Sequence, residues 1–125
     1  GYHYEQELSL LGDKPLPILK LLRQAYKRAI SVRQTKEAWW ICIKPKQQNI
    51  YFVLNSRNQG DIQSLDNVEH LEPRCEFHMD ERLLYFCLSG YYHFNEAQGG
   101  SHIWCVRRPD KYVEDIDEFM FFLTI

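Results

Sequence analysis

The segment EAWWICIK, Glu37 to Lys44, restricts the fold more than any other part of the sequence. Successive residues of a β-strand point to opposite faces of a sheet, and here both alternating sets are apolar. A strand of this kind is covered on both faces. A turn over PKQQN then leads to IYFVLN, residues 50–55, which is most simply its hairpin partner. The sequence therefore predicts a covered sheet that contains these two strands.

Amphipathic segments on either side of this hairpin predict helices. Over residues 14–33, apolar side chains recur at helical spacing, Asp13 is a suitable N-cap, and the prolines fall in the first turn. A shorter helix is expected over residues 61–71, ending before Pro73. The last segment opens at Pro109 and places a set of apolar residues on one face: Tyr112, Ile116, Phe119, Met120 and Leu123.

Three further strands are expected, RCEFHM (74–79), RLLYFCLSGYYHF (82–94) and HIWCVR (102–107). The order of elements is then α-β-β-α-β-β-β-α. A chain of 125 residues fits one domain. The sequence therefore predicts a single α+β domain over residues 1–125, with a five-stranded, mainly antiparallel sheet and helices packed on it. Residues 1–12 are expected to form a tail or an extra edge strand.

Cysteine and histidine occur three residues apart in both CEFH (75–78) and HIWC (102–105). In a strand, residues three apart point to opposite faces, so neither pair can converge on one ion. A structural zinc site also needs knuckle turns, which both stretches lack. We therefore expect no metal and no cofactor, and we interpret the four cysteines as buried, reduced thiols.

The register of the predicted hairpins gathers aromatic and histidine residues on one face of the last three predicted strands. A two-residue turn at Asp80 and Glu81, with NEAQGG as the next loop, sets His93 opposite His102. One face then collects an apolar core, and the other collects Arg74, Glu76, His78, Leu83, Tyr85, Cys87, Ser89, Tyr91, His93, His102, Trp104 and Val106. Aromatic residues are enriched where proteins meet partners. The candidate contact surface is Tyr85, Tyr91, His93, His102 and Trp104, and the structural alternative is that the middle helix covers it.

The histidine pair is the sharpest local feature of that face. Directly opposed strand residues bring their Cβ atoms within about 5.5 Å of each other. Two imidazoles at this distance could share a metal, titrate as a coupled pair, or stack on neighbouring rings. The simpler alternative is a solvent-facing pair beside a loop.

The charge is distributed unevenly along the chain. Residues 14–57 hold ten Lys or Arg and one acid, for a net +9, whereas residues 58–125 hold five and thirteen, for a net −8. Four cations fall on the polar side of the first predicted helix: Lys20, Arg23, Lys27 and Arg28. This basic helix face could contact nucleic-acid phosphate, an anionic lipid surface or an acidic protein, and otherwise it is a solvated face.

The sequence contains little that indicates a catalytic site. Ser101 beside His102 lacks a GxSxG turn, and the acids from Asp110 to Glu118 fit the first turn and wet face of a helix. No apolar run reaches the roughly 18 residues of a transmembrane helix. The first residues also lack the pattern of a signal peptide. We therefore expect a cytoplasmic protein that is not an enzyme.

The predicted order of elements resembles that of roadblock and profilin-like domains. The resemblance implies a noncatalytic scaffold or regulatory module that pairs with itself through a sheet face or edge. The sequence thus predicts a protein-interaction module, homodimeric through the Tyr, Trp and His face. The main alternative is a small-ligand or metal-binding sensor centred on His93 and His102. A further alternative is nucleic-acid binding through the basic helix face.

Overall fold

A mixed β-sheet forms the centre of the computed structural model, which describes residues 16–57, 60–90 and 103–123. The elements are α2 (Ile18–Val32), β1 (Trp40–Pro45), β2 (Tyr51–Asn55), β3 (Gln63–Leu65), β4 (Arg74–Met79), α3 (Glu81–Leu88), β5 (Ile103–Arg108) and α5 (Glu114–Leu123). The strand order is β3-β2-β1-β4-β5. β1 and β4 run parallel, and the other neighbouring pairs are antiparallel. The predicted fold class and the five-stranded, mainly antiparallel sheet are confirmed.

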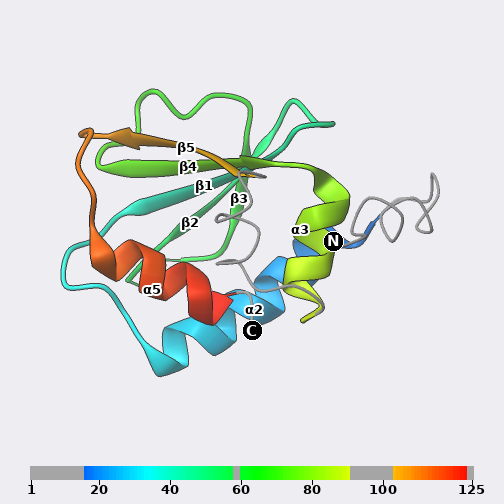
Figure 1. The fold of residues 1–125 in the computed structure, drawn as a ribbon, viewed down its shortest axis with the longest axis horizontal. Helices are drawn as coiled ribbons and strands as arrows, with labels where there is room; N and C mark the ends of the chain where they lie inside the picture. Colours follow the sequence, from blue (N-terminus) through cyan, green and yellow to red (C-terminus); the bar gives the residue numbers. More distant parts are fainter. Residues whose placement is uncertain (1–15, 58–59, 91–102, 124–125) are drawn as a thin grey trace, which may run out of the picture.

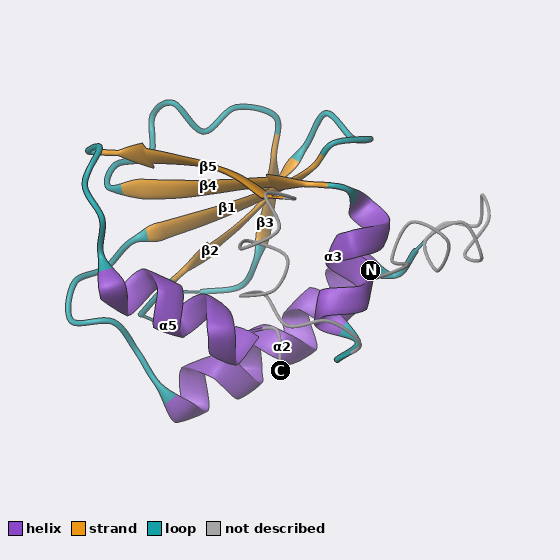
Figure 2. Ribbon diagram, viewed as in Figure 1, coloured by secondary structure: helices purple, strands orange, loops and turns teal. Residues whose placement is uncertain are grey.

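The helices share one face of the sheet (Figures 1 and 2). α2 lies beside α5 and also contacts α3, which lies toward the opposite end of the helix layer. Apolar residues of the helices and of the facing strands form one core cluster. Its members with at most 2% of their surface exposed include Leu22, Ala29, Ile41, Ile43, Leu54, Cys75, Phe77, Leu84, Phe119 and Leu123. Burial of this layer is the main force that holds the helices on the sheet.

β1 is covered on both faces, as its sequence predicts. Ile41 and Ile43 belong to the core under the helices, whereas Cys42 belongs to a second cluster with Val53 and Val68 on the far face. The predicted hairpin of β1 and β2 is confirmed as well, with Ile43 paired to Phe52. β1 is therefore the inner strand around which the sheet is built.

The helix predicted over residues 61–71 is wrong. Gln63–Leu65 instead forms β3, an antiparallel partner of β2. The Asp61 side chain accepts a hydrogen bond from the backbone N–H of Ile62, and Asn67 does the same for Glu69. Such local bonds stabilise turns in competition with a helix. Ile62 joins the core under the helices and Val68 the far-face cluster, so their helical spacing does not mark one helix face.

The strand predicted over residues 82–94 is also wrong, because Glu81–Leu88 forms the helix α3. Asp80 caps it by accepting hydrogen bonds from the backbone N–H groups of Arg82 and Leu83. Leucines favour helices, and the buried pair Leu84 and Leu88 recurs at helical spacing. Residues 91–94 of that prediction lie outside the described ranges.

The predicted turn at Asp80 and Glu81 therefore does not exist, and β4 pairs with β5 directly. Met79 lies opposite Ile103, and His78 lies opposite Trp104. Part of the predicted division into faces survives. Cys75, Phe77, Met79, Ile103 and Cys105 belong to or pack against the core under the helices. Arg74, Glu76, His78, Trp104 and Val106 share the far face by strand alternation.

The first and last helices agree with the sequence. α2 spans Ile18–Val32 within the predicted 14–33, and α5 buries Ile116, Phe119, Met120 and Leu123. Tyr112 departs from the prediction, since it precedes α5 and is 65% exposed. The predicted cap Asp13 and the tail over residues 1–12 lie outside the described residues.

Burial of the cysteines gives a first testable prediction. Burial raises the pKa of both the Cys42 and the Cys75 thiol to about 12. Near pH 8 they should hold roughly a thousandfold less thiolate than an ordinary cysteine, and only the thiolate reacts. We expect an aromatic disulfide reagent to label these two at the rate of unfolding. Fast labelling of either, followed by mass spectrometry, would contradict their placement in the core.

Candidate ligand site

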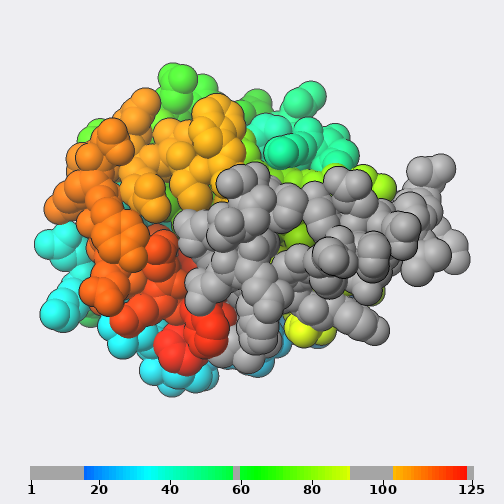
Figure 3. Space-filling view, in the orientation of Figure 1, coloured from blue at the N-terminus to red at the C-terminus, as the bar shows by residue number. Residues whose placement is uncertain are grey.

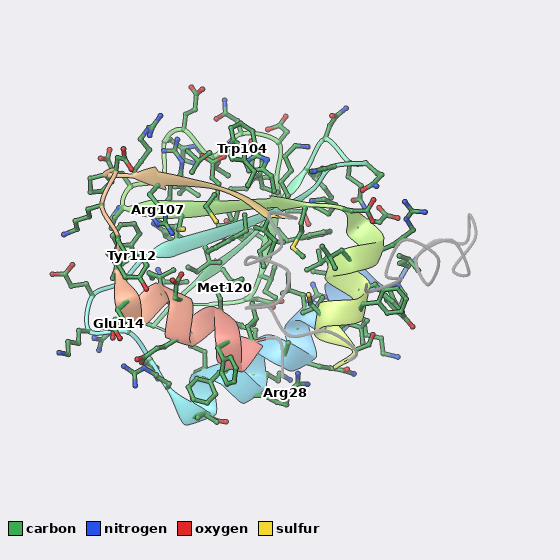
Figure 4. All side chains as sticks on the ribbon, viewed as in Figure 1. Arg28, Trp104, Arg107, Tyr112, Glu114 and Met120 are labelled. Atoms are coloured by element: carbon green, nitrogen blue, oxygen red, sulfur yellow. The ribbon has the colours of Figure 1, made fainter. Side chains whose placement is uncertain are left out.

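A pocket of about 520 Å³ lies against the outer side of α5. We call it the α5 pocket, and its lining residues are Arg33, Tyr112, Glu114, Asp117, Glu118, Phe121 and Phe122. Figure 4 shows Tyr112 and Glu114 together where the chain enters α5. Volumes of about 300–1,000 Å³ are typical of small-molecule sites. The α5 pocket is therefore large enough for a ligand.

Aromatic rings supply the apolar part of the α5 pocket. The rings of Phe121 and Phe122 meet edge to face, with centroids 5.8 Å apart, and Phe122 packs against the core. The guanidinium of Arg107 lies 5.7 Å from the ring centroid of Tyr112. Figure 3 shows β5 and α5 on the same face of the molecule. The three aromatic residues, which we call the pocket floor, lie among four charged lining residues, and such a mixed lining suits an amphiphilic molecule better than an ion.

A smaller pocket of about 200 Å³ lies beside the start of α5. We call it the Trp39 pocket, and its lining residues are Thr35, Lys36, Glu37, Trp39, Val113 and Asp115. Trp39 is 2% exposed, and Val113 packs against the core. The Trp39 pocket therefore reaches into the apolar layer between sheet and helices.

An ion pair joins the linings of the two pockets. Arg33, which lines the α5 pocket, donates a hydrogen bond of 3.0 Å to Asp115 Oδ1, which belongs to the Trp39 pocket. The backbone N–H of Lys36 donates to Asp115 Oδ2 at 3.1 Å, and Arg33 also pairs with Glu118. These contacts tie α5 to the chain that leaves α2, and so they position both pockets.

Acid should weaken this connection. The Lys36 N–H and the Arg33 guanidinium lower the pKa of Asp115 below its ordinary value of 3.8. A group with a lowered pKa in the folded state contributes stability above its unfolded pKa and loses it as the pH falls through the folded pKa. Near pH 7, Asp115→Asn should cost less than about 1 kcal/mol, since the pair is partly exposed.

The difference in unfolding free energy between wild type and Asp115→Asn should shrink as the pH falls below about 3.8. Urea unfolding at a series of pH values measures it. A difference that stays constant down to the acid limit would contradict the ion pair. Asp66→Asn is a suitable control, because Asp66 lies in the exposed segment after β3.

The structure separates the candidate contact surface of the sequence analysis. Tyr85 lies on α3, half-buried against the core under the helices. Trp104 lies on the side of the sheet away from the helices (Figure 4). It is 66% exposed, and its ring centroid is 5.0 Å from that of His78. Tyr91, His93 and His102 lie outside the described residues. Because residues 81–88 are helical, the continuous face that was to unite these residues is not present.

The four residues of the predicted basic helix face, Lys20, Arg23, Lys27 and Arg28, are exposed on α2. Arg23 lies 3.6 Å from Asp61, and both side chains are largely exposed. Arg23 and Lys27 also line a pocket of about 610 Å³ with Tyr26, Ile30, Ser31, Gly60 and Asp61. Within the described ranges, no group of three or more His, Cys, Asp or Glu side chains could hold a metal ion. None of the described helices is long and apolar enough to cross a membrane.

Sequence reasoning missed Trp39, Phe121 and Phe122 as site residues. One signal was present: the run FMFFL ends α5 with three phenylalanines, more than one buried stripe of a helix can cover. Phe119 fills the stripe, and the other two form the pocket floor. No sequence signal separated Trp39 from the ordinary core.

Comparison with known proteins finds similar structures but no similar sequence family. No protein-family model matches the sequence, and no curated protein matches it. The structure is similar to that of sterol carrier protein-2 like-3 from Aedes aegypti, with a TM-score of 0.53, 10% identity, and coverage of 74% of this chain and 87% of that one. For sterol carrier protein 2 from Yarrowia lipolytica in its apo form, the values are 0.48, 11%, 85% and 78%. At these identities the likeness concerns the fold.

This likeness overturns the functional prediction from sequence. The sequence predicts a homodimeric, regulatory protein-interaction module, with a small-ligand or metal-binding sensor centred on His93 and His102, or nucleic-acid binding, as alternatives. The fold is instead similar to that of a protein named a sterol carrier. The physical reason for the error is the assignment of residues 82–94 to a strand, which created the continuous aromatic face on which that prediction rested.

Proposed function

We propose that the chain reversibly binds a lipid-class molecule, with the apolar part of the ligand in the α5 pocket. The observation that carries the proposal is a pocket of about 520 Å³ with three aromatic residues, at the margin of the helix layer. The fold likeness supports it, because the Aedes aegypti protein is named as a sterol carrier. A sterol or a long-chain amphiphile is therefore the ligand class to test.

The chemistry of the pocket favours partition of an apolar group from water. Burial of one methylene contributes about 0.8 kcal/mol, which is roughly a fourfold gain in affinity. Phe121, Phe122 and the ring of Tyr112 provide the apolar surface. Affinity should therefore rise by about this factor for each carbon along a series of 1-alkanols, until the chain exceeds the pocket.

We also propose that binding occurs without chemical turnover and in the cytoplasm. The sequence offers no nucleophile motif, which supports a binding role. The four cysteines are free thiols, as is usual in a reducing compartment.

A matched pair of charged variants tests the site. Phe121→Glu puts a carboxylate in the pocket floor, whereas Trp104→Glu puts one on the exposed far face. Using displacement of a fluorescent sterol by 1-decanol, we expect Phe121→Glu to weaken binding tenfold or more, on the order of the cost of desolvating a charge. Trp104→Glu should bind like wild type. Equal affinities in all three proteins would overturn the α5 pocket as the site.

A further inference from the structure

We propose that the indole N–H of Trp39 is the hydrogen-bond donor for the polar end of the ligand, and that this end is an uncharged hydroxyl or carbonyl group. The inference rests on the proposed function and specifies its ligand. Trp39 is 98% buried, since 2% of its surface is exposed, and it lines the Trp39 pocket. Among the described residues, its Nε1 has no hydrogen-bond partner.

The neighbouring polar groups are already engaged with one another. The backbone N–H of Trp39 donates to Ser56 Oγ at 2.9 Å, and the Trp39 carbonyl accepts from the Ser56 N–H at 2.9 Å. The hydroxyls of Ser56 and Thr35 lie 2.6 Å apart, and Thr35 Oγ1 also donates to the Glu37 carbonyl. These bonds hold the backbone of Trp39 in place. Among the described residues, the indole N–H takes no part in them and has no acceptor.

Asp115 is one of the two carboxylates in the lining of the Trp39 pocket, and both of its oxygens already accept hydrogen bonds. One oxygen accepts from Arg33 and the other from the backbone N–H of Lys36. A buried donor without an acceptor costs about 1–3 kcal/mol, so a ligand that supplies one gains affinity. The unpaired indole N–H therefore selects for a ligand with a hydrogen-bond acceptor at its polar end.

The charge of the lining argues against an anionic head group. Asp115 is paired with Arg33, so the charge is best counted over both pockets: their linings hold two cations, Arg33 and Lys36, and five carboxylates, Glu37, Glu114, Asp115, Asp117 and Glu118. A carboxylate or phosphate on the ligand would meet a net negative surface, whereas a hydroxyl, ester or ketone would not. Because the Arg33 and Asp115 pair joins the linings of the two pockets, the proposal places the chain of the ligand in the α5 pocket and its head at Trp39.

Nuclear magnetic resonance of the 15N-labelled protein tests the donor directly. The probes are 1-hexanol, its near-isosteric partner 1-chlorohexane, which is a poor acceptor, and hexanoate. The Trp39 indole signal is assigned with Trp39→Phe, since Trp40 and Trp104 give the other two. We expect 1-hexanol to move the Trp39 indole proton downfield, with little change from 1-chlorohexane although it binds.

Affinities of the variant complete the test. Trp39→Phe should weaken 1-hexanol about fivefold, the effect of one net hydrogen bond, and leave 1-chlorohexane unchanged. An indole signal that stays in place at saturation, or an equal loss for both probes, would overturn the role of Trp39 and leave lipid binding intact. Hexanoate binding as tightly as 1-hexanol would overturn the uncharged head group. Failure of every probe to bind would overturn the proposed function as well.

Discussion

Phe119→Ala is expected to lower the free energy of unfolding by about 3–5 kcal/mol. Phe119 is fully buried, and its ring meets that of Tyr26 edge to face with centroids 6.5 Å apart. The hydroxyl of Tyr26 in turn donates to the Asn55 carbonyl at 2.6 Å, so this contact links α5 to α2 and to β2. Truncation leaves a cavity at the interface between α5 and α2, and this interface positions both pockets. Urea unfolding followed by circular dichroism measures the loss.

Phe121→Ala provides the control for that experiment. Phe121 lies two residues further on the same helix, but it is only half-buried and lines the α5 pocket. Its truncation should cost less than half as much, because less surface leaves contact with protein. Equal losses for the two variants would mean that α5 does not dock through Phe119.

Glu76→Ala should be destabilising by a similar amount, about 3–5 kcal/mol, for an electrostatic reason. On the far face of the sheet, Glu76 is 6% exposed, and its Oε2 lies 2.9 Å from Nε of Arg74, which is 8% exposed. Its Oε1 lies 3.0 Å from Nε2 of His78. Removal of the carboxylate leaves the guanidinium buried without its counter-charge. Thermal unfolding near pH 7 measures the effect.

A double variant separates this reading from a simple loss of packing. Arg74→Met combined with Glu76→Leu removes both charges and keeps similar volume, and such replacements are often neutral or stabilising. We expect the double variant to recover most of the stability that Glu76→Ala loses. If it is as unstable as the single variant, the loss does not come from an uncompensated charge.

The strongly periodic segments of the sequence could be predicted because a single period dominates each one. EAWWICIK has apolar residues on both alternating sets and is the inner strand β1. Residues 18–32 repeat apolar positions at helical spacing and form α2, with Leu22, Ala25 and Ala29 buried. In both cases burial acts on the same residues that set the pattern, so local sequence and tertiary packing agree.

The two wrong assignments lie where the local sequence pattern and the tertiary packing favour different structures. Residues 82–88 are apolar nearly throughout, so periodicity does not distinguish a covered strand from a buried helix. The Asp80 cap and the leucines decide in favour of α3. Ile62, Leu65 and Val68 have helical spacing, but Asp61 and Asn67 form turns around a strand of three residues. Short edge strands depend on their partner more than on their own sequence.

The candidate site could not be predicted because it joins distant parts of the chain. Arg33 and Asp115 are 82 residues apart, and the pocket walls exist only once α5 packs beside α2. The unpaired N–H of Trp39 follows from the fold around Ser56 and Thr35, not from any local motif. The predicted aromatic face depended on a register that the helix α3 removes.

Photolabelling with a long-chain alcohol that bears a diazirine at its chain end shows where the ligand binds. We expect saturable labelling of a peptide that spans residues 112–122, suppressed by excess unlabelled alcohol and lost in Phe121→Glu. Peptides from β5 with Trp104 should stay unlabelled. Labelling spread evenly over the chain, or labelling that excess alcohol does not suppress, would contradict a lipid site at α5.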